Sequence, residues 1–171
     1  MLLSFLNLTF TVGSMKIGLI PDFLGYILIL KGIREISEEG IHFSKAELYI
    51  KGMIAYTLCA YITDLLGITD QINQVTWIVQ GIIFAIIALY ITYLIIMGIA
   101  DIESQYKCNL KSETLYLLWK ARVVWPVLAY LVVFVPAIAL IILVIGFGVN
   151  VYFLISFNNS KNLYYEMVSQ R

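Results

Sequence analysis

The sequence predicts an all-α fold: a polytopic transmembrane helix bundle of about five to six segments, with the first two short or broken. Of the 171 residues, 61% are hydrophobic and only 13% are charged, whereas roughly 25% are charged in an ordinary soluble domain. The mean hydropathy is +0.91. This composition excludes a soluble globular enzyme, a basic nucleic-acid binder and a disordered chain. We therefore expect a single transmembrane domain over residues 1–171, with no soluble domain.

The N-terminal third is predicted as two short segments, at residues 2–12 and 22–36. The first corresponds to about 17 Å of helix and ends at a Gly-Ser pair; the second follows Pro21. Because neither piece spans a bilayer comfortably alone, broken helices or a re-entrant hairpin are expected. Alternatively, both span and the link between them lies in the interface. No basic residue precedes the first apolar run, so no cleaved signal peptide is expected.

The third segment is predicted at residues 46–67. Ser44 and Glu47 have the spacing of a capping box, in which each side chain bonds the other residue's backbone N–H. Lys51 lies one turn into the segment and can extend to the headgroups. Gly67 suits the position that ends a helix.

Two long charge-free stretches provide the remaining segments. The first holds one helix, predicted at residues 74–103. The second is too long for one helix, and Pro136 near its centre cannot continue a regular helix. We expect helices at 112–134 and 136–158; the alternative is one kinked helix at 123–145 with an interfacial tail.

Basic residues predict the orientation, because cytoplasmic loops are rich in Lys and Arg. Alternate links place ten of the eleven basic residues on one side, and only Lys16 on the other. We therefore expect a multi-pass protein of the cell (cytoplasmic) membrane, with the N-terminus and C-terminus both cytoplasmic.

Asp22 is the first candidate for a functional polar residue, since ionisable groups at bilayer depth are costly. It lies nine positions before Lys31, which places it about 13 Å from the cytoplasmic interface, near the midplane. A structural interpretation makes Asp22 the N-cap of the second segment. A functional one gives it an ion, proton or substrate role, and Tyr26 belongs to the same candidate site.

Arg122 and Asp64 complete the candidate polar residues. Arg122 lies ten positions into the fifth predicted segment, so it reaches a depth at which it could pair with Asp22. The alternative is that Arg122 anchors the helix at the headgroups. Asp64 lies about 20 Å beyond Lys51, which is typical of a solvated helix end. Elsewhere, intramembrane amides such as Gln80 and Asn150 usually hydrogen-bond between helices.

No motif for catalysis or metal binding is recognisable. His42 is the single histidine, and there is no HExxH, Walker A or GxSxG pattern. Cys59 and Cys108 are far apart in the predicted topology, so neither a bridge nor a metal site is expected. We therefore expect no catalytic residue, no metal and no cofactor, and a protein that is not an enzyme.

The run IGLIPDFLGYILILKGIREIS at Ile17 to Ser37 carries a resemblance. It is similar to a group of small, uncharacterised multi-pass membrane proteins of Gram-positive bacteria such as Clostridia and bacilli, whose signature is a Pro-Asp-Phe-x-Gly-Tyr stretch near the N-terminus. The FSKA stretch at Phe43 to Ala46 is also similar. The resemblance covers roughly a quarter of the chain. It implies a bacterial cytoplasmic membrane and brings no activity with it.

Three functions remain open. The first is a non-enzymatic accessory or regulatory membrane component, which meets the lipid bilayer and a membrane-protein partner or a second copy, and no nucleic acid. The second is a small transporter or channel that uses Asp22; a polar cavity reaching this residue would favour it. The third, an intramembrane enzyme, has the least support, because no nucleophile is paired with a base.

Overall fold

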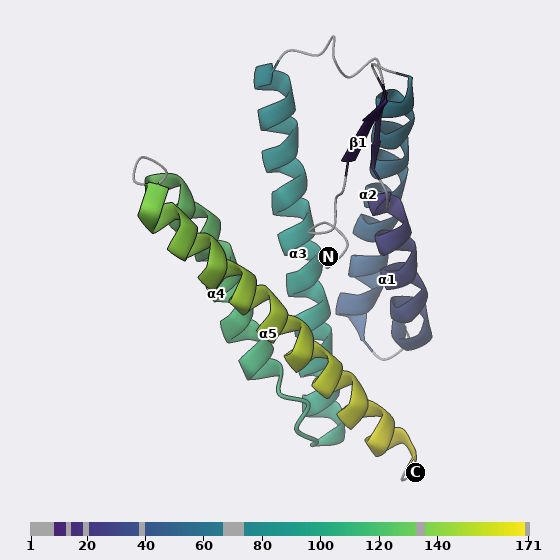
Figure 1. The fold of residues 1–171 in the computed structure, drawn as a ribbon. Helices are drawn as coiled ribbons and strands as arrows, with labels where there is room; N and C mark the ends of the chain where they lie inside the picture. The colour runs from purple at the N-terminus through teal and green to yellow at the C-terminus, as the bar shows by residue number, and fades with distance from the viewer. Residues whose placement is uncertain are drawn as a thin grey trace. The chain divides into compact units, whose positions relative to one another are not determined.

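The structure is a computed structural model that describes residues 9–12, 15–18, 21–37, 40–66, 74–132 and 136–169. Its elements form an N-terminal β-hairpin followed by α-helices (Figure 1). In chain order they are β1 (Thr9–Val12), β2 (Met15–Gly18), α1 (Asp22–Ile36), α2 (Ile41–Leu65), α3 (Gln74–Tyr106), α4 (Ser112–Val132) and α5 (Pro136–Ser169). The chain forms two compact units, Met1–Ile91 and Thr92–Arg171, and α3 contributes to both.

The helical part of the predicted fold is confirmed, and most helices begin where the sequence places them. α1, α3, α4 and α5 begin at Asp22, Gln74, Ser112 and Pro136. Proline suits the first turn of a helix, where its missing N–H would have no partner. The alternative of one kinked helix across Pro136 is therefore wrong: α4 and α5 are separate helices that pack side by side and run in opposite directions (Figure 1).

The first predicted segment differs from expectation. Residues 9–12 form β1, which pairs antiparallel with β2 from Thr9↔Gly18 to Val12↔Met15. The prediction of an all-α fold with a helical segment at 2–12 is therefore wrong for residues 9–12, whereas residues 2–8 lie outside the described part. β-branched and aromatic residues favour strands, and a Gly-Ser pair between two such runs is typical of a hairpin.

The start of α2 also differs from expectation. The helix begins at Ile41 after Gly40, five residues before the predicted start, so Ser44 and Glu47 lie inside it and form no capping box. The physical reason is the apolar face of the helix. Its buried residues recur at helical spacing and include one turn before the predicted start: Phe43, Ala46, Ile50 and Met53.

In the first unit, α1 and α2 pack as an antiparallel pair (Figure 1). The rings of Phe23 and Tyr61 lie 5.8 Å apart at one end of the pair, and Arg34 meets Glu47 at the other. α2 is ten residues longer than α1, and β2 also contacts α2. β2 of the hairpin and α1 therefore both pack against the longer helix α2.

The second unit contains the C-terminal part of α3 together with α4 and α5. Tyr93 of α3 contacts Tyr116 and Trp119 of α4, with ring centroids 6.4 and 5.3 Å apart. Small buried serines, Ser156 and Ser160, line α5 one turn apart. The apolar core is completed by Leu94, Ile96, Ile99, Ile102, Leu110, Leu115, Leu118 and Phe153.

Among the residues described, one helical stretch is long and apolar enough to cross a membrane. It is Val79–Tyr106 of α3. α5 continues as helix to Ser169, eleven residues beyond the predicted end at 158. Its last part is rich in polar residues, so the apolar stretch of α5 ends before the helix does.

Candidate functional site

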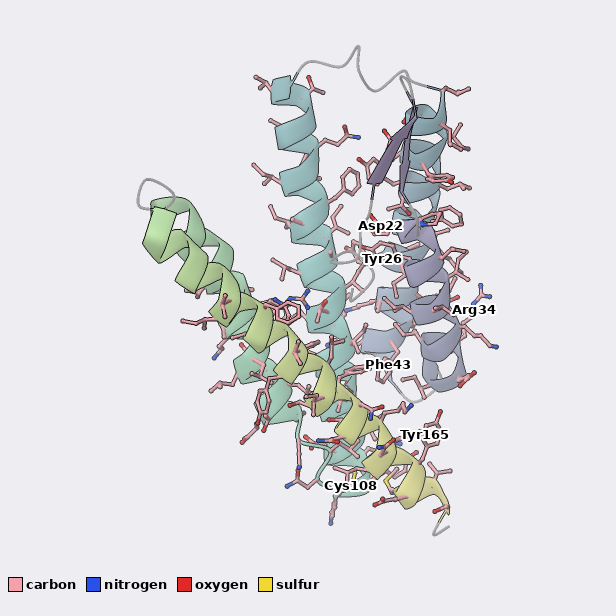
Figure 2. The ribbon with its side chains drawn as sticks, viewed as in Figure 1. Asp22, Tyr26, Arg34, Phe43, Cys108 and Tyr165 are labelled. Atoms are coloured by element: carbon pink, nitrogen blue, oxygen red, sulfur yellow. The ribbon has the colours of Figure 1, made fainter. Side chains whose placement is uncertain are left out.

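Asp22 and Tyr26 lie one turn apart on α1 (Figure 2). Asp22 is exposed and Tyr26 is half-buried. The N-cap position belongs to Pro21, and Leu24 N donates a 3.1 Å hydrogen bond to its carbonyl. The prediction that Asp22 is the N-cap is therefore wrong by one residue. Asp22 lies in the first turn, where its carboxylate meets the positive end of the helix dipole.

Asp64 lies in the last turn of α2 and is half-buried. It interacts electrostatically with Tyr56, whose side chain also hydrogen-bonds with Gln80 of α3. The Tyr56 ring stacks on Phe84, with centroids 3.3 Å apart. Gln80 therefore joins two helices, as expected for an intramembrane amide.

Asn150 behaves differently from Gln80. Its side-chain amide donates a 2.8 Å hydrogen bond to the carbonyl of Gly146, one turn earlier in the same helix. The prediction of an interhelical bond is therefore not met by this interaction. A helix carbonyl one turn away satisfies an amide without a second helix.

The linked ends of α1 and α2 carry a small ionic cluster. Glu47 Oε1 accepts hydrogen bonds from Lys51 Nζ at 2.9 Å and Arg34 Nε at 3.1 Å. The hydrogen bonds from Lys51 and then from Arg34 hold the pKa of the Glu47 carboxyl below its usual range. The two cations are about half exposed, so this cluster belongs to the polar end of α2, before its apolar part.

Arg122 lies on α4 in the second unit. Its guanidinium carbon lies 5.6 Å from the ring centroid of Phe153, a buried residue of α5. A cation over an aromatic face is stabilised by the ring quadrupole. Arg122 therefore has an aromatic contact in its own unit, and its pairing with Asp22, in the other unit, stays a prediction.

The second unit also contains a cavity with a mixed polar and apolar lining, which the sequence did not predict. Its volume is about 810 Å³, and it lies between the end of α3, the start of α4 and the middle of α5. Cys108 lies in the link between α3 and α4 (Figure 2) and contributes to the wall of this cavity. Its polar lining includes Glu103, Ser104, Lys111, Ser112, Glu113 and Ser156.

Glu103 fixes the wall of this cavity. Its carboxylate accepts hydrogen bonds from the backbone amides of Leu110 and Ser112 and from the Ser112 hydroxyl. These amides lie at the start of α4, where N–H groups lack partners within the helix. Glu103 therefore acts as a cap supplied by the preceding helix. The positive φ angles of Lys107 and Lys111, 48° and 63°, turn the chain between the two helices.

Comparison of the chain with protein-family models, with curated proteins and with solved structures gave no match. The resemblance in the Pro-Asp-Phe-x-Gly-Tyr stretch therefore stays a prediction. Within the described ranges, no group of three or more His, Cys, Asp or Glu residues is arranged to hold a metal ion.

Proposed function

We propose that this chain is a multi-pass protein of a bacterial cell membrane, with both termini cytoplasmic, and that it acts as a non-enzymatic accessory or regulatory component. The observation that carries the membrane assignment is the apolar surface of α3. Val79, Ile82, Ile83 and Ile86 are each at least half exposed. Exposed apolar area costs about 25 cal/mol per Å² in water, so contact with lipid tails would stabilise this surface.

α1 supports the same proposal. Leu24, Ile27 and Leu28 share one face of the helix and are exposed. Lys31 and Arg34 follow within two turns and are also exposed. A change from an exposed apolar face to exposed cations is typical of a helix that passes from hydrocarbon into the headgroup region.

The accessory role is inferred from the hairpin. Among the described residues each strand pairs along one edge only, so its other edge presents backbone N–H and C=O groups. Three residues separate the hairpin from α1, which begins at the residue predicted to lie near the midplane. In hydrocarbon, such groups need protein or water as partners. A membrane-protein partner or a second copy would supply protein; a transporter or channel would supply water next to Asp22, which keeps that function as the second candidate.

The two native cysteines test the membrane proposal. Cys59 is exposed on α2, and Cys108 lies in the link between α3 and α4. We expect a membrane-impermeant maleimide to label Cys108 only after the cell membrane is opened. Cys59 should label only after detergent solubilisation, because lipid covers it in the bilayer. Single-cysteine variants, Cys59→Ser and Cys108→Ser, assign the signal. Labelling of Cys59 in intact membranes would contradict the proposed span.

A flux assay separates the two candidate roles. Proteoliposomes that contain the wild type or Asp22→Asn are compared with empty liposomes for proton and cation leakage. The accessory role predicts equal flux in all three samples. Flux above the empty liposomes that Asp22→Asn abolishes would favour the transporter or channel instead.

A further inference from the structure

We propose that the cavity between α3, α4 and α5 binds a zwitterionic phosphoethanolamine group, as the headgroup of a membrane lipid. The inference deepens the proposed function, because it rests on the membrane location. It stands on three observations within the second unit: an unpartnered serine hydroxyl on the cavity wall, two unpaired opposite charges and an apolar flank.

The serine hydroxyl belongs to Ser156. This residue lines the cavity and is only 6% exposed. Its backbone carbonyl accepts a bond from Ser160, but its own side-chain oxygen has no hydrogen-bond partner among the described residues. Because no side-chain oxygen of the described residues is both enclosed and without a partner, this hydroxyl reaches the solvent in the cavity. The hydroxyl is therefore available to a ligand in the cavity.

The two charges are those of Lys111 and Glu113. Both side chains line the cavity and are exposed. In the described part of the chain neither forms an ion pair. The other carboxylate of the lining, Glu103, is occupied by the start of α4. One free ammonium and one free carboxylate on the same cavity complement a ligand that carries both an anion and a cation.

The third observation concerns size and surroundings. Tyr152 and Ile155 of α5 flank the cavity and expose apolar surface beside it. The volume of about 810 Å³ falls in the range of drug-sized ligand sites, which exceeds the size of a single ion. In the proposed topology this end of α4 lies at the cytoplasmic interface. A headgroup with its glycerol fits the cavity, and the acyl chains would follow the apolar flank.

The ligand chemistry follows from these groups. The phosphate would accept hydrogen bonds from the Lys111 ammonium and the Ser156 hydroxyl. The primary ammonium would donate to the Glu113 carboxylate. A quaternary ammonium has no N–H to donate, so a choline headgroup should bind less well; a glycerol headgroup has no cation for Glu113.

The experiment measures lipid retention by native mass spectrometry of the full chain. The protein is purified in detergent after equilibration with equimolar phosphatidylethanolamine, phosphatidylcholine and phosphatidylglycerol. The variants are Lys111→Asn, which suits a left-handed backbone, and Glu113→Gln. Lys45→Gln and Glu166→Gln are the matched controls, since both residues are exposed and lie outside the cavity lining. A parallel arm adds free phosphoethanolamine as a competitor.

We expect phosphatidylethanolamine to be retained at least about threefold over the other two lipids. Each cavity variant should remove this preference, and each control should keep it. Equal retention of all lipids by the wild type, or an unchanged preference in both cavity variants, would overturn the proposal. A preference for phosphatidylglycerol that only Lys111→Asn removes would overturn the zwitterionic assignment. Displacement of the lipid by equimolar free phosphoethanolamine would identify the free compound, and not the lipid, as the ligand. Purification of the chain without detergent would refute the membrane assignment itself, independently of these outcomes.

Discussion

Glu103 is expected to stabilise the second unit more than any exposed carboxylate. Its side chain accepts three hydrogen bonds from the start of α4. Glu103→Ala leaves these donors without their partner, and the net value of each bond is about 1 kcal/mol. We therefore expect Glu103→Ala to lower the free energy of unfolding by about 3 kcal/mol. Glu103→Gln keeps one carbonyl acceptor, so about half of that loss is expected.

The assay is reversible unfolding in mixed micelles, followed by tryptophan fluorescence. Hydrogen exchange adds a local measurement. If the start of α4 opens first, a loss of 3 kcal/mol corresponds to about 100-fold faster exchange at the amides of Leu110 and Ser112. Glu166→Ala is the matched control, because Glu166 is exposed and surface changes of this kind stay within about 0.5 kcal/mol. A Glu103→Ala effect no larger than that of the control would refute the capping role.

Three further results are expected. Phe43→Ala should lower the free energy of unfolding by about 3–5 kcal/mol, because Phe43 is fully buried; Leu48→Ala, at a position that is 71% exposed, is its control, and a loss below about 1 kcal/mol for Phe43→Ala would contradict the packing of α1 and α2. The pKa of Glu47 is lowered from 4.5, so its ion pairs stabilise the fold above that pH and lose this effect as pH falls through the lower folded-state pKa. The unfolding midpoints of the wild type and Glu47→Gln should therefore differ at neutral pH and converge in acid. A difference that stays constant with pH would oppose this role. Asp22→Asn should lower the free energy of unfolding by about 0.3–1 kcal/mol, the value of a charge at a helix N-terminus. A loss above about 3 kcal/mol would instead indicate the predicted ion pair with Arg122. In that case the double variant Asp22→Arg with Arg122→Asp should restore the stability.

The helices were predictable where the sequence carries a strong local signal. Pro21 and Pro136 restrict the backbone before or at a helix start, and the charged loop before Ser112 contrasts sharply with the apolar residues that follow. The start of α2 was less predictable. A capping-box pattern at Ser44 and Glu47 competes there with the apolar stripe that begins at Phe43, and tertiary burial outweighs the local signal.

The hairpin was overlooked, although its signal is present. Thr-Phe-Thr-Val before a Gly-Ser pair is typical of a strand and a two-residue turn, but the surrounding apolar run suggests a membrane segment. The cavity could not be predicted in the same way. Its walls come from Glu103 and Lys111 at one place in the chain and from Ser156 at another, and only the antiparallel packing of α4 and α5 brings these together.

α5 is one uninterrupted helix that extends well beyond the cavity. Its 34 residues correspond to about 51 Å, well over the roughly 30 Å of a hydrocarbon core. The cavity contacts it between Tyr152 and Asn159, and ten more helical residues follow to Ser169. A tilt of about 10° at Asn159 would move that far end by about 3 Å. Any rotation of α5 about the cavity is therefore largest at its C-terminal end, because the helix continues without a break beyond the cavity wall.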